Sequence, residues 1–142
     1  MSAVKGVTKT KIDAGTLENL DAIGTYNAEV LCMRDTYEAA GLAGASTLKM
    51  GGELPKGARV QEVVVGFDAL SGDTVVDVGD SADANRYCDA VDMTAAGFQR
   101  LEAVDGMDYV VGTADGDNQI VVTFTGASAL TGTIKTAVFY TI

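Results

Sequence analysis

Apolar and polar residues alternate along several short segments of the chain, which is the spacing expected when one face of a β-strand is buried. The clearest example is residues 59–67, whose predicted faces carry Val63, Val65 and Phe67 on one side and Val60, Glu62 and Val64 on the other. In all, the pattern predicts eight strands: residues 26–37, 47–50, 59–67, 74–78, 98–104, 109–113, 118–125 and 133–142. No segment shows a sustained helical period, so the chain is predicted to be all-β.

Turn signals separate these strands. Residues 71–73 (Ser-Gly-Asp) predict a hairpin that joins the strands on either side, and residues 115–118 (Asp-Gly-Asp-Asn) predict a second one. Pro55 stands before a strand, where its missing N–H group costs no ladder hydrogen bond. Short strands joined by such turns are typical of an antiparallel β-sandwich, and a jelly roll is the leading candidate. We expect an extended N-terminal arm over residues 1–22 and a single β-sandwich domain over residues 23–142.

The predicted arm is basic. It carries Lys5, Lys9 and Lys11 ahead of its first acidic residue, and Leu17 and Leu20 are spaced for one helical turn or for docking onto a neighbour. Two interpretations remain open. Either the arm reaches an acidic patch on a partner, or it is a frayed terminus.

The chain has a formal net charge of −10, and this charge is concentrated in one part of the sequence. Residues 68–117 contain 12 acidic residues and two basic ones, Arg86 and Arg100, so they carry the whole excess. Because an acidic surface repels phosphate backbones, we expect no direct binding of nucleic acid. An acidic surface also favours solubility, which is the simpler explanation for the excess.

Cys32 and Cys88 have no metal-binding spacing and are predicted to be free, buried, small apolar side chains. The first residues lack the apolar core of a signal peptide, and no run approaches the roughly 20 apolar residues of a membrane span. We therefore expect no contact with membranes and a protein that stays soluble where it is made. Reduced cysteines fit such a compartment.

The chain contains no histidine, which excludes Ser-His and Cys-His nucleophiles and removes the commonest metal ligand. Carboxylates are dense enough for two of them to face each other as in a glycosidase: Asp77, Asp80, Asp83, Asp89 and Asp92. A sugar cleft also needs aromatic platforms, however, and the chain has no tryptophan. No glycine-rich phosphate loop is present either, so we expect neither enzymatic activity nor nucleotide binding.

The acidic turns also raise the question of calcium. Oxygen ligands occur in two clusters: Asp77, Asp80, Asp83 and Asn85 in one, and Asp115, Asp117 and Asn118 in the other. Neither cluster has the ligand spacing of an EF-hand loop. Turn-forming Asp and Asn residues explain both clusters, so no metal and no other cofactor is predicted.

Four segments together resemble a known family. They are residues 54–58 (Leu-Pro-Lys-Gly-Ala) ahead of a valine-rich strand, residues 76–87, residues 92–97 (Asp-Met-Thr-Ala-Ala-Gly) and residues 131–140. In this order they resemble small head-associated proteins of tailed bacteriophages, above all capsid decoration, or cement, proteins of the jelly-roll type. The resemblance covers about residues 54–142, and the earlier residues share with that family only the presence of an arm.

The resemblance implies a structural virion protein that binds the outer face of the capsid and cements neighbouring major capsid subunits, without catalysis. The implied partner is the major capsid protein, and the implied location is the capsid surface, after assembly in the bacterial host cytoplasm. Self-association as a dimer or a trimer is expected, because capsids offer local two-fold and three-fold positions. The arm would contact the shell or a sister subunit through Lys5, Lys9, Lys11, Leu17 and Leu20.

A virion-associated receptor- or carbohydrate-binding β-sandwich module is the alternative, because similar sandwiches serve that purpose. Such a module would show a cluster of exposed aromatic side chains in its loops, and only Tyr87 and Tyr109 come near this pattern. Arg86 has a different expected role. As one of two basic residues in an acidic region, it is predicted to anchor the loop by an ion pair with Asp80, Asp83 or Asp89 rather than to bind a ligand.

Overall fold

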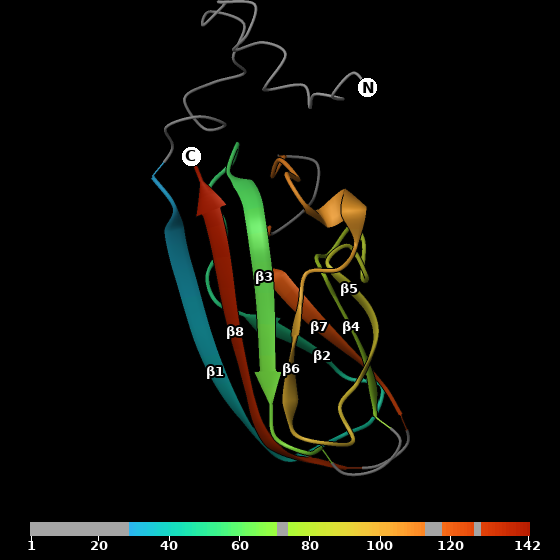
Figure 1. The fold of residues 1–142 in the computed structure, drawn as a ribbon. Helices are drawn as coiled ribbons and strands as arrows, with labels where there is room; N and C mark the ends of the chain where they lie inside the picture. The colour runs from blue at the N-terminus through green and yellow to red at the C-terminus, as the bar shows by residue number, and fades with distance from the viewer. Residues whose placement is uncertain (1–28, 71–73, 113–117, 127–128) are drawn as a thin grey trace, which may run out of the picture.

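The computed structural model of the protein describes residues 29–70, 74–112, 118–126 and 129–142 (Figure 1). The strands are β1 (Leu31–Leu42), β2 (Thr47–Met50), β3 (Arg59–Phe67), β4 (Val75–Gly79), β5 (Cys88–Asp92), β6 (Gly97–Arg100), β7 (Ile120–Thr125) and β8 (Leu130–Thr141). A 3-10 turn, η2 (Val104–Gly106), lies between β6 and β7. No helix in this part of the chain is long and apolar enough to cross a membrane.

The strands form two four-stranded antiparallel sheets, which pack face to face (Figure 1). The strand order is β1-β8-β3-β6 in the first sheet and β2-β7-β4-β5 in the second. Apart from β4 and β5, consecutive strands lie in different sheets, so most connections cross from one sheet to the other. This arrangement is the eight-stranded jelly roll, and it confirms the predicted all-β sandwich.

β8 is an inner strand of the first sheet. It pairs with β1 from Tyr140 opposite Leu31 to Leu130 opposite Leu42, and with β3 on its other side. The start of β1 therefore lies beside the end of β8, and Glu29 and Ile142 belong to the same end of the sandwich (Figure 1). We call this the arm end, because the described part of the chain begins there, at Glu29.

The core lies between the two sheets and is rich in β-branched side chains, which pack well on a pleated surface. Ile120, Val122 and Phe124, predicted to share one face, are all buried. Val60, Val63 and Val65 are also all buried, so the predicted placement of Val60 on the opposite face is wrong. The register of β3 against β8 shifts between Val60 and Glu62. This β-bulge adds one residue and returns Val60 to the core.

Several predicted strand boundaries are wrong. The first strand is Leu31–Leu42 rather than 26–37, and the last strand begins at Leu130. β5 lies where the pattern predicts an acidic loop. The strand was not predicted because a bulge against β4 and a positive φ of 52° at Ala90 interrupt its alternation of buried and exposed residues. Instead of a strand over residues 109–113, the described residues there contribute one isolated bridge, between Val110 and Arg59.

The two predicted hairpins are also wrong. The strands on either side of residues 71–73 are β3 and β4, and these lie in different sheets. β7, which follows residues 115–118, pairs with β2 and β4 rather than with the segment before it. Residues 71–73 and 113–117 themselves lie outside the described residues. Turn residues in the sequence therefore did not specify which sheet the following strand joins.

Cys88 is free and buried, as predicted, whereas Cys32 is free but exposed. The inner face of β1 is formed by the alternate positions that include Leu31 and Met33, which leaves Cys32 on the outer face. Burial raises the pKa of the Cys88 thiol to about 11, and the nearby Glu102 carboxylate adds to this effect. The two thiols should therefore differ sharply in reactivity, because the thiolate is the nucleophile.

We expect one thiol per chain to react rapidly with Ellman's reagent at pH 8 in the native protein, and both to react in denaturant. A Cys32→Ser variant should lose the rapid phase entirely. Rapid reaction of both thiols in native buffer would contradict the burial of Cys88 in the core of the sandwich.

Candidate interaction surface at the arm end

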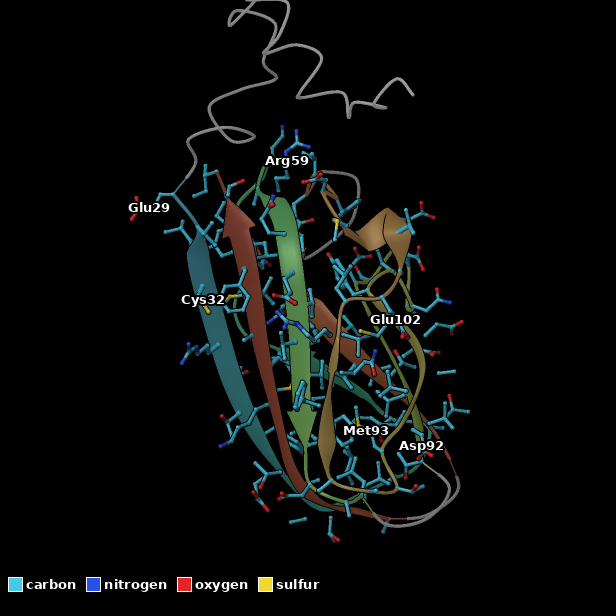
Figure 2. All side chains as sticks on the ribbon, in the orientation of Figure 1. Glu29, Cys32, Arg59, Asp92, Met93 and Glu102 are labelled. Carbon is cyan, nitrogen blue, oxygen red and sulfur yellow. The ribbon has the colours of Figure 1, made fainter. Side chains whose placement is uncertain are left out.

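Three loops meet at the arm end of the sandwich, beside the two described ends of the chain (Figure 1). They are the proline loop (residues 51–58), the acidic loop (residues 80–87) and the long loop (residues 101–119), of which residues 113–117 lie outside the described residues. Figure 2 shows Glu29 and Arg59 at this end, and Asp92 and Met93 towards the opposite one.

Backbone hydrogen bonds join the three loops to one another. The Leu54 amide donates to the Asn118 carbonyl (3.1 Å), which ties the proline loop to the long loop. The Glu102 amide donates to the Tyr87 carbonyl (3.1 Å), which ties the long loop to the acidic loop. Because each loop is held by another, the arm end is a preorganised platform rather than three independent loops.

Arg86 is the side chain at the centre of these contacts. Its Nε donates to Asp80 Oδ2 at 2.6 Å, and its guanidinium carbon lies 3.9 Å from the centre of the Tyr109 ring, in the long loop. The side chains of Arg86 and Asp80 are only 14% and 5% exposed. Burial alone would lower the pKa of Arg86, but the hydrogen bond and charge of Asp80, with smaller effects of Asp83 and Tyr87, together raise this pKa above its ordinary value. Arg86 therefore keeps its positive charge while partly removed from water.

Asp80 is also bonded within its own loop. Its Oδ1 accepts hydrogen bonds from the amides of Ala82 and Asp83, both at 2.9 Å. These bonds close a tight Asx-type turn directly after β4. Asp80 is one of the three partners that the sequence offered for Arg86, and the function of the pair as a loop anchor stays a prediction.

The acidic loop folds back closely onto the last residue of β4. A Cβ atom at Gly79 would lie 2.0 Å from the carbonyl oxygen of Asp83. A Cβ atom at Gly106, in η2, would lie 2.5 Å from the carbonyl oxygen of Arg86. Both neighbours are backbone atoms, which cannot swing aside, so these two glycines permit the close approach of the acidic loop to β4 and η2.

A surface hollow of about 480 Å³ lies between the acidic and long loops. Its lining is mostly acidic and consists of Asp83, Asn85, Arg86, Asp89, Glu102, Ala103 and Asp105. Several of these groups bond to each other: Asn85 Nδ2 donates to Asp89 Oδ1 (3.3 Å), and the Asp89 amide donates to Glu102 Oε1 (3.2 Å). Among the described residues, no three acidic, cysteine or histidine side chains are grouped as a metal site.

Exposed large apolar side chains concentrate at the arm end. Of those in the described residues, the arm end carries Val30, Val104, Met107, Val110 and Ile142. Val75 and Phe98 are the others, and both belong to the opposite end. Val75 is the first residue of β4, and Phe98 lies at the start of β6, where Gly97 pairs with Phe67 at the end of β3. The sequence pattern did not reveal this surface, because Val104 and Val110 were assigned to predicted strands.

The arm residues predicted to make contacts, Lys5, Lys9, Lys11, Leu17 and Leu20, lie outside the described residues. The two tyrosines considered for glycan binding are not free platforms. Tyr87 is buried, and Tyr109 packs against the core with Arg86 over its ring. In the described part of the chain, Phe98 is the one strongly exposed aromatic side chain.

No protein-family model matches the sequence, and no curated protein matches it significantly. Among solved structures, the chain resembles one chain of the cyanophage Pam1 capsid asymmetric unit, with a TM-score of 0.70 and 20% identity. That alignment covers 100% of this chain and 93% of the other. It also resembles a chain of the capsid of Ralstonia phage GP4, with a TM-score of 0.60 and 21% identity over 82% of this chain and 86% of the other. At this level of identity the likeness establishes a common fold.

Replacing Arg86 with alanine should loosen the acidic loop, because the buried Asp80 carboxylate loses its charged partner. We expect the free energy of unfolding to fall by about 1.5–3 kcal/mol, as for other hydrogen bonds to charged groups. Hydrogen exchange followed by mass spectrometry should show faster exchange at the amides of Ala82 and Asp83. Arg100→Ala is the matched control, since Arg100 is 64% exposed and its ion pair with Glu62 should contribute under about 1 kcal/mol. Equal effects of the two variants would contradict the anchoring function.

Gly79→Ala should destabilise the protein by about 3 kcal/mol, because the added methyl group meets the backbone of the acidic loop. Gly66→Ala is the control, since a Cβ atom there meets nothing within 4 Å. We expect the control to change the free energy of unfolding by less than about 0.5 kcal/mol in urea titrations. A Gly79→Ala protein as stable as the control would show that the backbone of the acidic loop does not pack closely against residue 79.

Proposed function

We propose that the protein is a structural virion protein that binds the outer face of a tailed-phage capsid and cements neighbouring major capsid subunits. The observation that carries this proposal is the shared jelly roll. Chains of two phage capsid structures have the same fold, and one alignment extends over the whole of this chain. The succession of motifs over residues 54–142 points to the same class of protein.

The charge of the chain favours the outer face of the shell over the inner one. A tailed-phage head is filled with DNA, and a protein with a net charge of −10 is repelled by a phosphate backbone. The acidic hollow at the arm end has four acidic side chains in its lining and one basic one, Arg86, whose guanidinium is already paired with Asp80. A position outside the shell avoids this repulsion.

Cementing requires contacts that are repeated around the shell rather than one deep pocket. Binding through many copies, or through a dimer or trimer, gives high total affinity from modest single contacts. The arm end fits such a contact, because it combines a preorganised platform with exposed apolar side chains. In our proposal the basic arm adds a second contact, with the shell or with a sister subunit, through Lys5, Lys9 and Lys11.

A receptor- or carbohydrate-binding module has less support. Its expected mark, a cluster of exposed aromatic side chains in the loops, is missing from the described residues, where Tyr87 and Tyr109 are packed inside. Glycan binding is therefore kept as an outcome of the test below rather than as a second proposal.

The test is co-sedimentation of the purified protein with empty capsids of the phage that encodes it. We expect saturable binding, with a copy number that matches a local symmetry position of the shell. Failure to sediment with capsids, together with binding on a glycan array, would replace the cement function with the adhesin function.

The contribution of the arm can be measured in the same assay. A variant with Lys5, Lys9 and Lys11 all changed to alanine should bind roughly tenfold more weakly, which corresponds to about 1.4 kcal/mol. The matched control changes Lys49, Lys56 and Lys135 to alanine, because these are exposed and the change in net charge is the same. Equal weakening in both variants would indicate a general charge effect and would refute a specific contact through the arm.

A further inference from the structure

β1 is the one long strand at a border of either sheet in the described part of the chain. It has 12 residues, whereas β2 and β6 have four each and β5 has five. Its pairing with β8 continues without a register shift from Leu31 to Ala40. Short border strands prevent further strands from adding to a sheet, and a long, regular one permits it.

The side of β1 that faces away from β8 has no strand beside it in the same sheet (Figure 1). Among the described residues, no backbone hydrogen bond joins β1 to any segment other than β8. In such a strand every second residue directs its N–H and C=O groups to the free side. These groups are available to a further strand unless a side chain covers them.

The Asp35 side chain covers the middle of this free side. Its Oδ1 accepts a hydrogen bond from the Thr36 amide at 2.8 Å, and its Oδ2 accepts one from the Gly51 amide at 2.7 Å. Because the Thr36 N–H group is directed at this carboxylate, it belongs to the free side of the strand. The carboxylate therefore occupies an N–H group that a second strand would need, and the proline loop holds it there.

The outer face of β1 carries charges that match in one self-paired arrangement. When a second copy of β1 lies antiparallel with Thr36 opposite the same residue, Arg34 of each copy stands opposite Glu38 of the other. Opposite charges at directly opposed positions stabilise a strand pair. Among the described residues Arg34 forms no ion pair, so its charge is left to be matched. The Glu38 carboxylate is held on this face by a hydrogen bond from the Thr133 hydroxyl at 2.7 Å.

Other registers of the same pairing are unfavourable. A shift by two residues places Thr36 opposite Arg34 or Glu38 and removes both ion pairs. A shift by four residues sets Arg34 opposite Arg34, or Glu38 opposite Glu38, so that like charges meet. A shift by an odd number sets groups that point to the free side opposite groups that point to β8, which breaks the ladder. Charge and backbone geometry together select one register.

The position of β1 also keeps the acidic regions of two copies apart. Residues 68–117 carry the whole excess of negative charge, and β4, β5 and β6 lie within them. β6 stands at the border of the first sheet opposite to β1. A second copy that pairs through β1 therefore adds to the sheet on the side away from this charge.

We propose that β1 is a pairing edge for a second copy of this chain, and that the Asp35 carboxylate keeps this edge closed in the isolated subunit. When the carboxylate leaves the Thr36 amide, the edge is open. The first sheets of two copies then join into one continuous sheet about a two-fold axis at Thr36. This inference concerns the protein alone, so it does not depend on capsid binding.

Replacement of Asp35 tests the closed edge. In analytical ultracentrifugation, Asp35→Ala should dimerise at least roughly tenfold more tightly than the unaltered protein, because the Thr36 amide is released. Asp35→Thr, whose β-branched side chain suits a strand and cannot bridge the two amides, should behave in the same way and guards against a folding defect of one variant. Glu29→Ala is the matched control, since it removes the same charge from an exposed residue just before β1. Equal association of the control and the Asp35 variants would overturn the proposal.

A disulfide at the two-fold axis identifies the paired surface. In a Cys32→Ser background, Thr36→Cys places two thiols at opposed positions, with Cα atoms about 4.5–5.5 Å apart, which a disulfide can span. We expect a disulfide-linked dimer under mild oxidation when Asp35→Ala is also present, and several-fold less when Asp35 is retained. Ala40→Cys in the same background is exposed on the same face but far from its own copy, so it should not crosslink. Equal crosslinking at positions 36 and 40, or crosslinking at position 36 that is absent or insensitive to Asp35, would overturn the proposal.

Exchange of the two outer charges tests the register. In the Asp35→Ala protein, Glu38→Arg should weaken the dimer roughly tenfold, because it sets Arg34 of each copy against a like charge. Addition of Arg34→Glu reverses both charges and should restore the affinity. A dimer that Glu38→Arg leaves unchanged, or that the double exchange does not restore, would show that the copies do not pair in this register.

Discussion

The pairing of β8 with β1 and β3 determines the layout of the rest of the molecule. The last strand of the chain lies between the first strand and β3, so this sheet is incomplete until β8 has been added. Its contacts join residues that are about as far apart in sequence as the described chain allows, for example Leu31 and Tyr140. Such closure costs chain entropy, which the buried valines and isoleucines between the sheets must offset. The same pairing brings both described ends of the chain to the arm end.

Because the chain ends meet there, the arm end combines features that are distant in sequence. The proline loop, the acidic loop and the long loop hydrogen-bond to one another, and Arg86 joins two of them through Asp80 and Tyr109. Close packing at Gly79 leaves the acidic loop little freedom. A surface that is already ordered loses little conformational entropy when it binds another surface. The rigid platform and its exposed apolar side chains therefore suit a contact surface better than a catalytic cleft.

The sequence predicted those parts of the fold that depend on local pattern. β2 and β3 were predicted with their observed bounds, and the buried face of β7 was predicted correctly, because uninterrupted alternation shows in the sequence. β5 was missed, since its bulge and the positive φ of Ala90 break the alternation. The predicted hairpins failed for another reason: local turn residues do not specify the sheet that the next strand joins.

The candidate surface was predictable only in part, for a related reason. Arg86 stood out because it is one of two basic residues in an acidic region. Its position in the sequence suggested three nearby carboxylates as ion-pair partners, and Asp80 is the one that it contacts. The apolar group at the arm end did not stand out, because exposure of Val104 or Ile142 depends on where three loops and a strand end meet.

The topology of the two sheets shows where the acidic excess of the chain lies. Most of it lies on β4, β5, β6 and their loops, and β5 and β6 are touching edge strands of the two sheets. Two copies that met along this edge would bring like charges together, which disfavours edge-to-edge pairing there. At the other edge, the carboxylate of Asp35 in β1 accepts a hydrogen bond from the Gly51 amide at 2.7 Å, which links β1 to the proline loop. We therefore propose that any self-association avoids the edge formed by β5 and β6.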